Sequence, residues 1–199
     1  MTSDRLKPKF FQSSNVVNLA RQLIGYKIYT KIDGQITSGV ITETEAYAGQ
    51  NDKACHAHLG RFTKRTSVMY EPGGIAYIYL CYGIHHLFNI VTNTKGNADA
   101  ILIRAFEPNL GIDHMLKRRN KPKLDKTLTS GPGNVSQALG LNKNHNKKSV
   151  CSDEIWIEKT DNPSIEITES TRIGIDYAEE DAKLPWRFYN KTSKFVSVR

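Results

Sequence analysis

The fold class of this chain is decided by one stretch in its first quarter: Tyr26-Lys27-Ile28-Tyr29-Thr30-Lys31-Ile32-Asp33-Gly34-Gln35-Ile36-Thr37-Ser38-Gly39-Val40-Ile41-Thr42-Glu43-Thr44-Glu45-Ala46-Tyr47. Two strand-like runs, Tyr26–Ile32 and Gln35–Tyr47, flank the pair Asp33-Gly34. Asp-Gly is favoured in the two-residue turn of an antiparallel hairpin. The stretch therefore predicts two antiparallel strands joined by a tight turn.

Further strand and helix patterns lie on both sides of this hairpin. Residues Ser14–Gly25 have apolar side chains at helical spacing, with Ser14 or Asn15 as N-cap and Gly25 as the end. A second hairpin is expected around Gly83. The other expected elements are strands Ile75–Tyr82 and His85–Thr92 of that hairpin, a strand Ala100–Phe106 ended by Glu107-Pro108, helices Leu110–Arg119 and Asn134–Leu139, and short strands Ile155–Glu158, Ile165–Thr168, Arg187–Tyr189 and Phe195–Val198. Antiparallel strands with helices segregated around them predict the α+β class.

Length and composition bound the architecture. The chain has 199 residues, which predicts a single domain over residues 1–199. Its hydrophobic fraction of 39% is enough for a packed core. We expect no membrane span, because no apolar run approaches the ~20 residues that a span needs. No apolar stretch follows the first residues, so we expect no signal peptide. Three scattered cysteines, Cys55, Cys81 and Cys151, argue against a disulfide framework and favour a cytoplasmic location.

The charge is unevenly distributed along the chain. The formal net charge is +8, but residues 152–181 hold ten acidic and two basic residues, so the remainder carries +16. Such a density of positive charge attracts polyanions or anionic membranes, of which nucleic acid is the commonest case. The alternative is a basic, hydrated surface without a specific partner.

Two carboxylates and an aromatic ring share one face of the first hairpin. Side chains alternate along a strand, so Glu43, Glu45 and Tyr47 point to the same side. This pattern is typical of a solvated strand face. It is also what a carboxylate held beside a stacking ring would look like.

The second predicted hairpin carries several tyrosines. Tyr77 and Tyr79 share a strand face, and Tyr82 lies at the tip. A large aromatic side chain at an exposed tip calls for an explanation, and stacking on nucleobases or wedging between them supplies one. The alternative is a core tyrosine with the turn placed elsewhere.

Other motifs give weaker signals. Cys55-His56-Ala57-His58 and Cys81 with His85-His86 contain zinc-ligand residue types without the spacing of a zinc site, so we expect no metal. No P-loop or G-x-G-x-x-G is present, and we expect no cofactor. Ser130–Asn134 could offer backbone amides to a phosphate, or be a turn and helix cap. The basic run Lys117–Lys123 could grip phosphates, or be a solvated loop.

Taken together, these segments resemble the alkyladenine (3-methyladenine) DNA glycosylase family, in a compact form of bacterial type. The resemblance covers nearly the whole chain, from about Phe10-Phe11 to Val196-Ser197-Val198. The order and spacing of the segments make it specific. They are Gly39–Tyr47, Asp52–His56, Tyr77–Gly83, Asn89-Ile90, Ile101–Pro108, Ser130-Gly131-Pro132 and Pro185–Tyr189.

The resemblance implies a single α+β domain with a curved antiparallel sheet, peripheral helices and a protruding β-hairpin. It implies a monofunctional base-excision enzyme that needs no metal or cofactor and acts on double-stranded DNA with a damaged base. We further expect a monomer associated with the nucleoid. The family's roles, carried onto this sequence, make Glu45 the general base on a water, Arg104 a holder of that water, Tyr47, His56 and Tyr79 the walls around the flipped base, Tyr82 the inserting wedge and Asn89 a pocket residue.

The chain departs from the family pattern in three places. Lys64 and Thr66 stand where proline and asparagine are expected, the hairpin after Gly83 continues with Ile84-His85, whose side chains vary in what they could touch on DNA, and Asn93–Asp99 is slightly longer than in mammalian members. These differences concern DNA contacts and the range of lesions, which the sequence leaves open. They do not touch the residues assigned to the chemistry.

Two other classes of protein remain compatible with the residues. A non-catalytic module that binds damaged DNA would need the basic surface and Tyr82, but not Glu45. A hydrolase of small-molecule nucleosides would need the carboxylate, but neither the basic surface nor the exposed tip. An alkylated purine is a good leaving group, so a glycosylase would mainly need a carboxylate to direct water at C1′.

Overall fold

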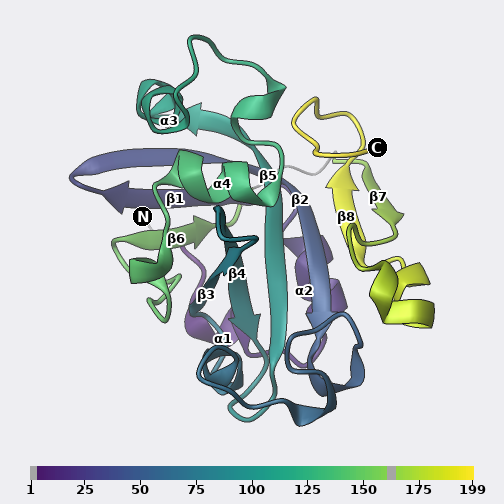
Figure 1. Cartoon of the computed structure of the whole chain (residues 1–199). Coiled ribbons are helices and arrows are strands. Elements are labelled where there is room, and N and C mark those ends of the chain that lie inside the picture. Colours follow the sequence, from purple (N-terminus) through teal and green to yellow (C-terminus); the bar gives the residue numbers. More distant parts are fainter. Residues whose placement is uncertain (1–3, 161–164) are drawn as a thin grey trace.

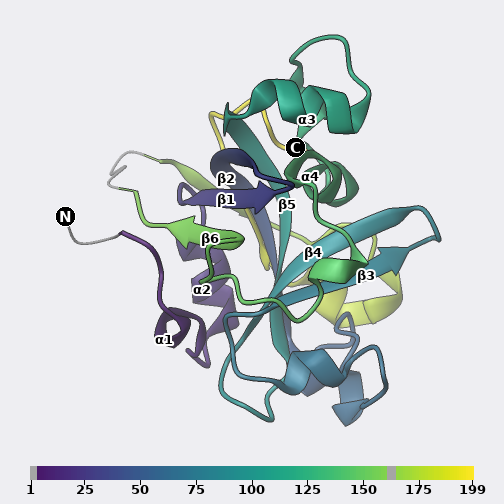
Figure 2. The same ribbon diagram turned by 90° about the vertical axis from the view of Figure 1, so that its left-hand side faces the viewer.

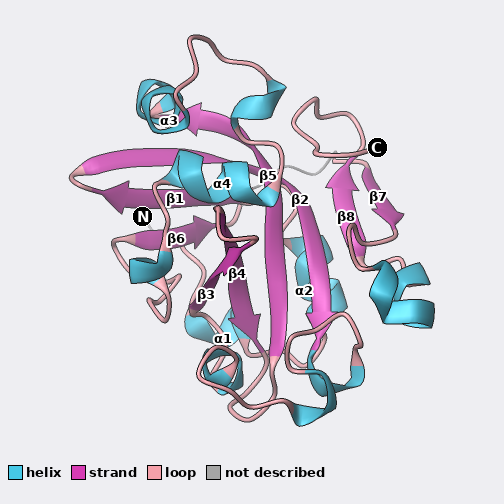
Figure 3. Cartoon of the chain, viewed as in Figure 1, coloured by secondary structure: helices cyan, strands magenta, loops and turns pink. Residues whose placement is uncertain are grey.

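An eight-stranded antiparallel sheet forms the framework of the protein (Figure 1). The computed structural model describes residues 4–160 and 165–199. The strands follow the order β3-β4-β5-β2-β1-β6, while β8 pairs with both β2 and β7. The elements are α1 (Pro8–Phe11), α2 (Val16–Gln22), β1 (Lys27–Ile32), β2 (Gln35–Ala48), β3 (Ala76–Cys81), β4 (His85–Thr92), β5 (Asp99–Leu110), α3 (Ile112–Arg119), α4 (Pro132–Leu139), β6 (Ile155–Glu158), β7 (Ile167–Ser170) and β8 (Arg187–Asn190). The helices lie around the sheet rather than between its strands (Figure 3), which confirms the α+β prediction.

The hairpin predicted at Asp33-Gly34 joins β1 to β2. Both turn residues have positive φ, 51° and 74°, and Ile32 pairs directly with Gln35. Two positive φ angles define the turn that best matches the twist of the flanking strands. The first prediction from the sequence is therefore confirmed in its local geometry.

β2 is the longest strand and changes partners along its length. Its first half pairs with β1, while Glu43, Thr44 and Glu45 pair with β8. On its other edge β2 pairs with β5, with register shifts at Ser38/Gly39 and on either side of Glu43. Bulges of this kind bend a strand and re-aim its side chains. The bend curls the sheet and brings the two glutamates under the cover of β8 and the chain that follows it.

The second hairpin, β3 with β4, extends away from the rest of the sheet (Figure 2). Its turn is made by Tyr82 at φ 50° and Gly83 at φ 73°. Ile84 closes it by donating its N–H to the carbonyl of Cys81 at 3.2 Å. The expected protruding hairpin and the position of its tip are both confirmed.

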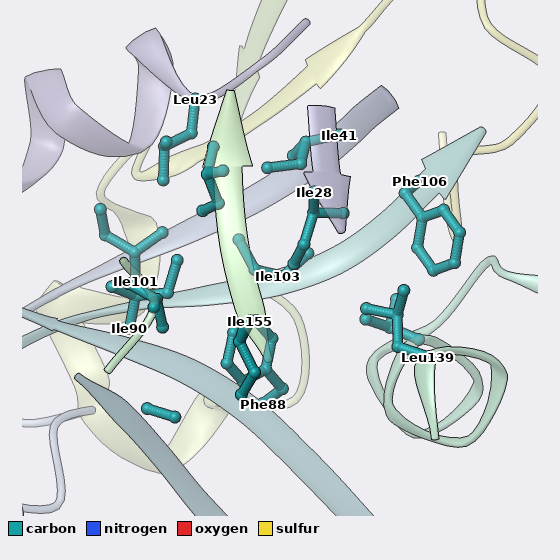
Figure 4. Close-up of a cluster of buried hydrophobic side chains, with 14 of the residues drawn as sticks. Leu23, Ile28, Ile41, Phe88, Ile90, Ile101, Ile103, Phe106, Leu139 and Ile155 are labelled. Atoms are coloured by element: carbon teal, nitrogen blue, oxygen red, sulfur yellow. The ribbon is translucent and has the colours of Figure 1, made fainter. Parts of the chain in front are cut away.

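One large apolar core lies between the sheet and its helices. Figure 4 shows side chains from the C-terminal end of α2, from the strands and from α4 meeting in this cluster, with Leu23 and Leu139 on opposite sides of the strand residues. Ile28, Ile41 and Phe106 are completely buried there. At roughly 1.5–3 kcal/mol for each buried side chain of this size, the cluster supplies the main drive for folding.

Several predicted boundaries are wrong, for local reasons. β5 does not end before Pro108 but continues through it, and Pro108 pairs with Gly39 of β2. On the other edge of β5, the pairing with β4 ends at Leu102. The missing N–H of the proline therefore breaks no hydrogen bond with β4. β7 begins at Ile167, where its pairing with Asn190 starts.

The stretch Phe195–Val198 is not a strand. Its backbone groups bond to side chains instead: the Ser197 N–H donates to Glu43, and the Phe195 carbonyl accepts from Thr42. α2 is shorter than predicted at both ends. α4 is two residues longer than predicted, because it starts at Pro132, whose missing N–H suits the first position of a helix.

Among the described residues, no helix is both long enough and apolar enough to cross a membrane.

Candidate active site

A cavity of about 390 Å³ opens beside the β3–β4 hairpin. Its lining comes from β2, β3, β4 and β5, from the loops after β2 and β7, and from the N-terminus of α4. The predicted site residues that line it are Tyr47, His56, Tyr79, Tyr82, Asn89 and Arg104. Glu45, the seventh, lies directly behind two of them. The fold thus brings together every residue that the sequence singled out for the chemistry.

Glu45 is fully buried on β2 and lies beneath the cavity. Its Oε2 accepts hydrogen bonds from the Tyr47 hydroxyl at 2.8 Å and from Nη1 of Arg104 at 3.2 Å. Its Oε1 accepts from the backbone N–H of Ile173 at 2.8 Å. The prediction that Glu43 and Glu45 lie on a solvated strand face is therefore wrong. The carboxylate is held rigidly and lies next to side chains that line the cavity.

Glu43 is equally buried but has a different environment. Its Oε1 accepts from Nε of Arg104 and from Nη1 of Arg187, both at 3.0 Å. The backbone N–H of Ser197 donates to Oε2 at 2.6 Å. Both carboxylate oxygens are thus engaged by anchoring groups. Glu43 is thus surrounded by two arginines and the C-terminal chain, whereas all three groups bonded to Glu45 belong to residues that line the cavity.

Arg104 bridges these two carboxylates and reaches the cavity from β5. Burial lowers the pKa of its guanidinium, the carboxylates of Glu45 and Glu43 raise it, and the net direction is upward. The side chain therefore carries a permanent positive charge. Its Nε and Nη1 are fixed by the glutamates, so the orientation of the guanidinium plane is set.

A second buried ion pair lies behind Tyr47, and neither member was predicted to have a role in the site. Arg172 donates to both carboxylate oxygens of Asp52, at 2.5 and 2.9 Å, and to the carbonyl of Ala46 at 3.0 Å. Its Cζ lies 4.9 Å from the centre of the Tyr47 ring. The pair fixes that ring and the backbone that delivers the Ile173 N–H to Glu45. The sequence signals were an arginine within a strongly acidic segment and the place of Asp52 at the start of the segment Asp52–His56.

Aromatic side chains form the walls of the cavity. The ring centres of His56 and Tyr79 are 4.7 Å apart at an interplanar angle of 75°, and Tyr77 lies 5.3 Å from Tyr79. Nδ1 of His56 lies 2.8 Å from the Tyr77 hydroxyl. Burial, reinforced by the charges of Arg65 and Arg61, lowers the pKa of His56 to about 4. The imidazole is therefore neutral at physiological pH.

Tyr82 stands at the rim, with 91% of its surface exposed. The alternative of a core tyrosine is wrong. Ile84, on the same turn, is 72% exposed. Exposed apolar and aromatic side chains gathered beside a cavity mark a contact surface more often than scattered ones do.

Asn89 lies on β4, is buried and lines the cavity. Its Nδ2 donates to the carbonyls of Tyr77 at 3.1 Å and Leu87 at 3.4 Å. It therefore ties backbone groups of β3 and β4 together and also forms part of the cavity wall.

Arg65 also lines the cavity, although the sequence did not single it out. Its Cζ lies 4.5 Å from the centre of the Tyr79 ring, and Nη2 lies 3.0 Å from Nε2 of His56. It comes from the loop in which Lys64 and Thr66 depart from the family pattern.

The acidic segment does not form an isolated acidic face. Several of its carboxylates pair with basic residues from elsewhere in the chain. These pairs are Glu154 with Lys148, Glu166 with Lys191, Glu169 with Arg21 and Glu179 with Lys53. Asp161 lies outside the described residues. The segment thus neutralises basic side chains within the molecule.

The basic run Lys117–Lys123 is partly structural. Arg118 donates to the carbonyl of Ala138 at 3.0 Å, and Arg119 donates to the carbonyl of Leu128 at 3.2 Å. Burial lowers the pKa of both guanidinium groups. These two arginines hold α3 against neighbouring segments of the same chain. They are therefore described neither by the predicted phosphate contact nor by the predicted solvated loop.

The residues Ser130–Asn134 form a turn and helix start. Gly131 precedes α4 with φ 105°, and Nδ2 of Asn134 donates to the carbonyl of Ser130 at 2.7 Å. A Cβ on Gly133 would lie 2.9 Å from the His85 ring, so α4 packs closely on the hairpin.

No group of three or more His, Cys, Asp or Glu side chains in the described ranges is placed to hold a metal ion. Cys55 is buried, and burial raises the pKa of its thiol to about 12.

Comparison with known proteins agrees with this geometry. The sequence model of the family described as methylpurine-DNA glycosylase (MPG) matches residues 9–194. A Chlamydia felis protein named "Putative 3-methyladenine DNA glycosylase" is 52% identical over 196 residues, covering 97% of this chain and 100% of that protein. Proteins of the same name from Alkaliphilus oremlandii and Desulfitobacterium hafniense are 42% and 40% identical, covering 97% and 98% of this chain and 98% and 99% of their own lengths. The chain belongs to the methylpurine-DNA glycosylase family.

Proposed function

We propose that this DNA glycosylase hydrolyses the N-glycosidic bond of alkylated purines of the 3-methyladenine type, flipped out of duplex DNA, with water activated by Glu45. The observation that carries the proposal is the buried Glu45–Arg104 pair at the base of an aromatic cavity beside an exposed tyrosine. Each part answers one physical requirement of base excision.

The first requirement is access to the target base. A glycosylase must take the base out of the stack, at a cost of a few kcal/mol that is least for damaged or mispaired bases. Tyr82 is exposed at the tip of a hairpin that projects from the sheet, which suits insertion into the vacated position. The net positive charge of the chain, +8, would attract the DNA backbone.

The second requirement is recognition of the base. The cavity volume lies within the range of small-molecule sites. Tyr47, His56 and Tyr79 would enclose a purine, and the electron-rich faces of the tyrosines attract the positive charge of an alkylated ring. A neutral His56 adds no repulsion to that charge.

The third requirement is a positioned nucleophile. Glu45 would take a proton from water as it attacks C1′, and Arg104 would help to hold that water. The two cationic side chains that line the described cavity are arginines, which do not form Schiff bases with the sugar. We therefore infer hydrolysis to a free base and an abasic site, without cleavage of the strand.

The test is a duplex oligonucleotide with one N7-methylguanine, incubated with excess protein in the presence of EDTA. The expected products are free base and an alkali-labile abasic site in a strand that stays intact before alkali treatment. Tight binding of the damaged duplex without base release would favour the non-catalytic module. Hydrolysis of the free nucleoside, but not of the duplex, would favour a nucleoside hydrolase. Activity that EDTA removes and zinc restores would contradict the metal-free mechanism.

A further inference from the structure

The cavity of the protein already contains a planar cation, the guanidinium group of Arg65. Its Cζ lies 4.5 Å from the centre of the Tyr79 ring. Its Nη2 lies 3.0 Å from Nε2 and 3.3 Å from Nδ1 of His56. These rings belong to the walls that would enclose a flipped base. Arg65 therefore uses the surfaces that a substrate base needs.

A guanidinium group and an alkylated purine offer similar features to such a cavity. Both are flat, delocalised cations that stack on aromatic faces. The aromatic walls attract either one through the same cation–π interaction. The two groups compete for one surface. An incoming base therefore has to interact with the aromatic walls more favourably than Arg65 does.

The loop that carries Arg65 is anchored, while the side chain itself is exposed. The Thr63 N–H donates to Oγ1 of Thr66 at 2.8 Å, and that hydroxyl donates to the Arg61 carbonyl at 2.8 Å. No ion pair involving Arg65 occurs among residues 4–160 and 165–199. Its guanidinium can leave the cavity by side-chain rotation, without breaking a salt bridge or moving the backbone.

We propose that Arg65 is a selectivity residue that occupies the cation position of the aromatic cavity and has to be displaced by the flipped base. The inference rests on the proposed function and concerns which bases the site admits. An alkylated, positively charged purine replaces the lost cation–π contact with its own. A neutral purine does not, so its capture is weakened by the full cost of moving Arg65. The arrangement favours damaged bases before any chemistry takes place.

The test compares Arg65→Gln with Arg61→Gln. Both substitutions remove one positive charge from the same exposed loop, but Arg61 does not line the base cavity. The probe is a duplex with a single 2-aminopurine, a neutral purine whose fluorescence rises when it leaves the stack. Removal of the competing cation should raise the apparent affinity of base capture by about two- to thirty-fold in Arg65→Gln. Arg61→Gln should not raise it.

The opposite result would identify Arg65 as a phosphate contact. In that case both variants would bind undamaged and 2-aminopurine duplexes more weakly, and each would lower the salt dependence of binding by about one counterion. Unchanged capture in Arg65→Gln would equally overturn the inference. Wild-type release of N7-methylguanine is measured in parallel. If the wild type releases N7-methylguanine but Arg65→Gln shows no gain in base capture, only the role of Arg65 is overturned. If the wild type releases no N7-methylguanine, the proposed function is overturned and this inference with it.

Discussion

The hydroxyl of Tyr47 donates a 2.8 Å hydrogen bond to Oε2 of Glu45, two residues earlier on the same strand. Burial and the neighbouring carboxylate of Glu45 raise the pKa of Tyr47 well above its ordinary value, so the hydroxyl remains a donor at neutral pH. The Tyr47 ring, which forms one wall of the cavity, and the carboxylate of Glu45 are therefore coupled. A nucleobase that stacks on Tyr47 would be close to Glu45, because both side chains belong to one strand.

Glu45→Gln should abolish base release while leaving DNA binding nearly intact. The amide has almost the same shape as the carboxylate but cannot accept the proton from water. General base catalysis typically contributes 10²–10⁴-fold, so the single-turnover rate should fall by about that factor. Near-normal rates in this variant would show that Glu45 is not the base.

Glu43→Gln should act mainly on stability. Removal of this charge leaves Arg104 and Arg187 buried with less compensation. Loss of one partner of a buried ion pair costs about 3–5 kcal/mol, so the free energy of unfolding should fall by an amount of that order. Urea unfolding of the two glutamate variants measures the difference. Glu45→Gln should cost less stability, because Glu45 pairs with one arginine and Glu43 with two. Equal losses would contradict this difference.

Tyr82→Ala should weaken the capture of a flipped base without destabilising the fold. The side chain is 91% exposed, so its removal costs little packing. Stacking on an aromatic side chain is worth ~1–3 kcal/mol for each base, which corresponds to roughly 5- to 150-fold in the capture equilibrium. Tyr82→Phe keeps the ring and serves as the control. An extrahelical-base signal that is the same in all three proteins would argue against insertion by Tyr82.

Asn89→Ser should increase the release of unmodified guanine relative to alkyladenine. Guanine carries an amino group at C2 that adenine lacks, and a side chain packed there can exclude it. A penalty of ~1–3 kcal/mol corresponds to about 5- to 150-fold discrimination. The measurement is guanine release from undamaged duplex at equal activity on alkyladenine. An unchanged ratio would leave Asn89 with only its hydrogen bonds to the carbonyls of Tyr77 and Leu87.

His56 should make the protein less stable in mild acid. Burial, with the charges of Arg65 and Arg61, lowers its pKa from 6.5 to about 4 in the fold. The unfolded chain takes up the proton at higher pH than the folded chain does. The contribution to stability is therefore complete above pH 6.5 and is lost as the pH falls from 6.5 to 4, by ~3 kcal/mol. Unfolding free energies at several pH values should show this loss in the wild type and a smaller one in His56→Gln.

Local chemistry made much of the fold predictable from the sequence. The Asp33-Gly34 pair determines its own turn, because its residues tolerate the positive φ angles that the hairpin requires. Alternation along β2 placed Glu45 beside Tyr47, and the turn after β3 exposed Tyr82. These features depend on residues a few positions apart. The resemblance to a known family then supplied the roles that spacing alone left open.

The anchoring of the site could not be predicted in the same way. The Arg172–Asp52 pair joins residues 120 positions apart, and the Ser197–Glu43 bond joins residues 154 positions apart. No local period encodes such partners, which are determined by how the sheet curls. The bulges beside Glu43 and the contact of Arg65 with Tyr79 likewise depend on tertiary packing.

The bond between Ser197 and Glu43 has a consequence for how the protein is made. Glu43 is synthesised early, but its Oε2 receives the backbone N–H of Ser197 only after 154 further residues have been joined. Until then a buried carboxylate and two arginines lack part of their compensation. Arg187 on β8 and Ser197 both come late in the chain, so the surroundings of Glu43 are completed only when the last strand pairs with β2. The order of synthesis therefore delays the anchoring of Glu43 until the C-terminal strand is in place.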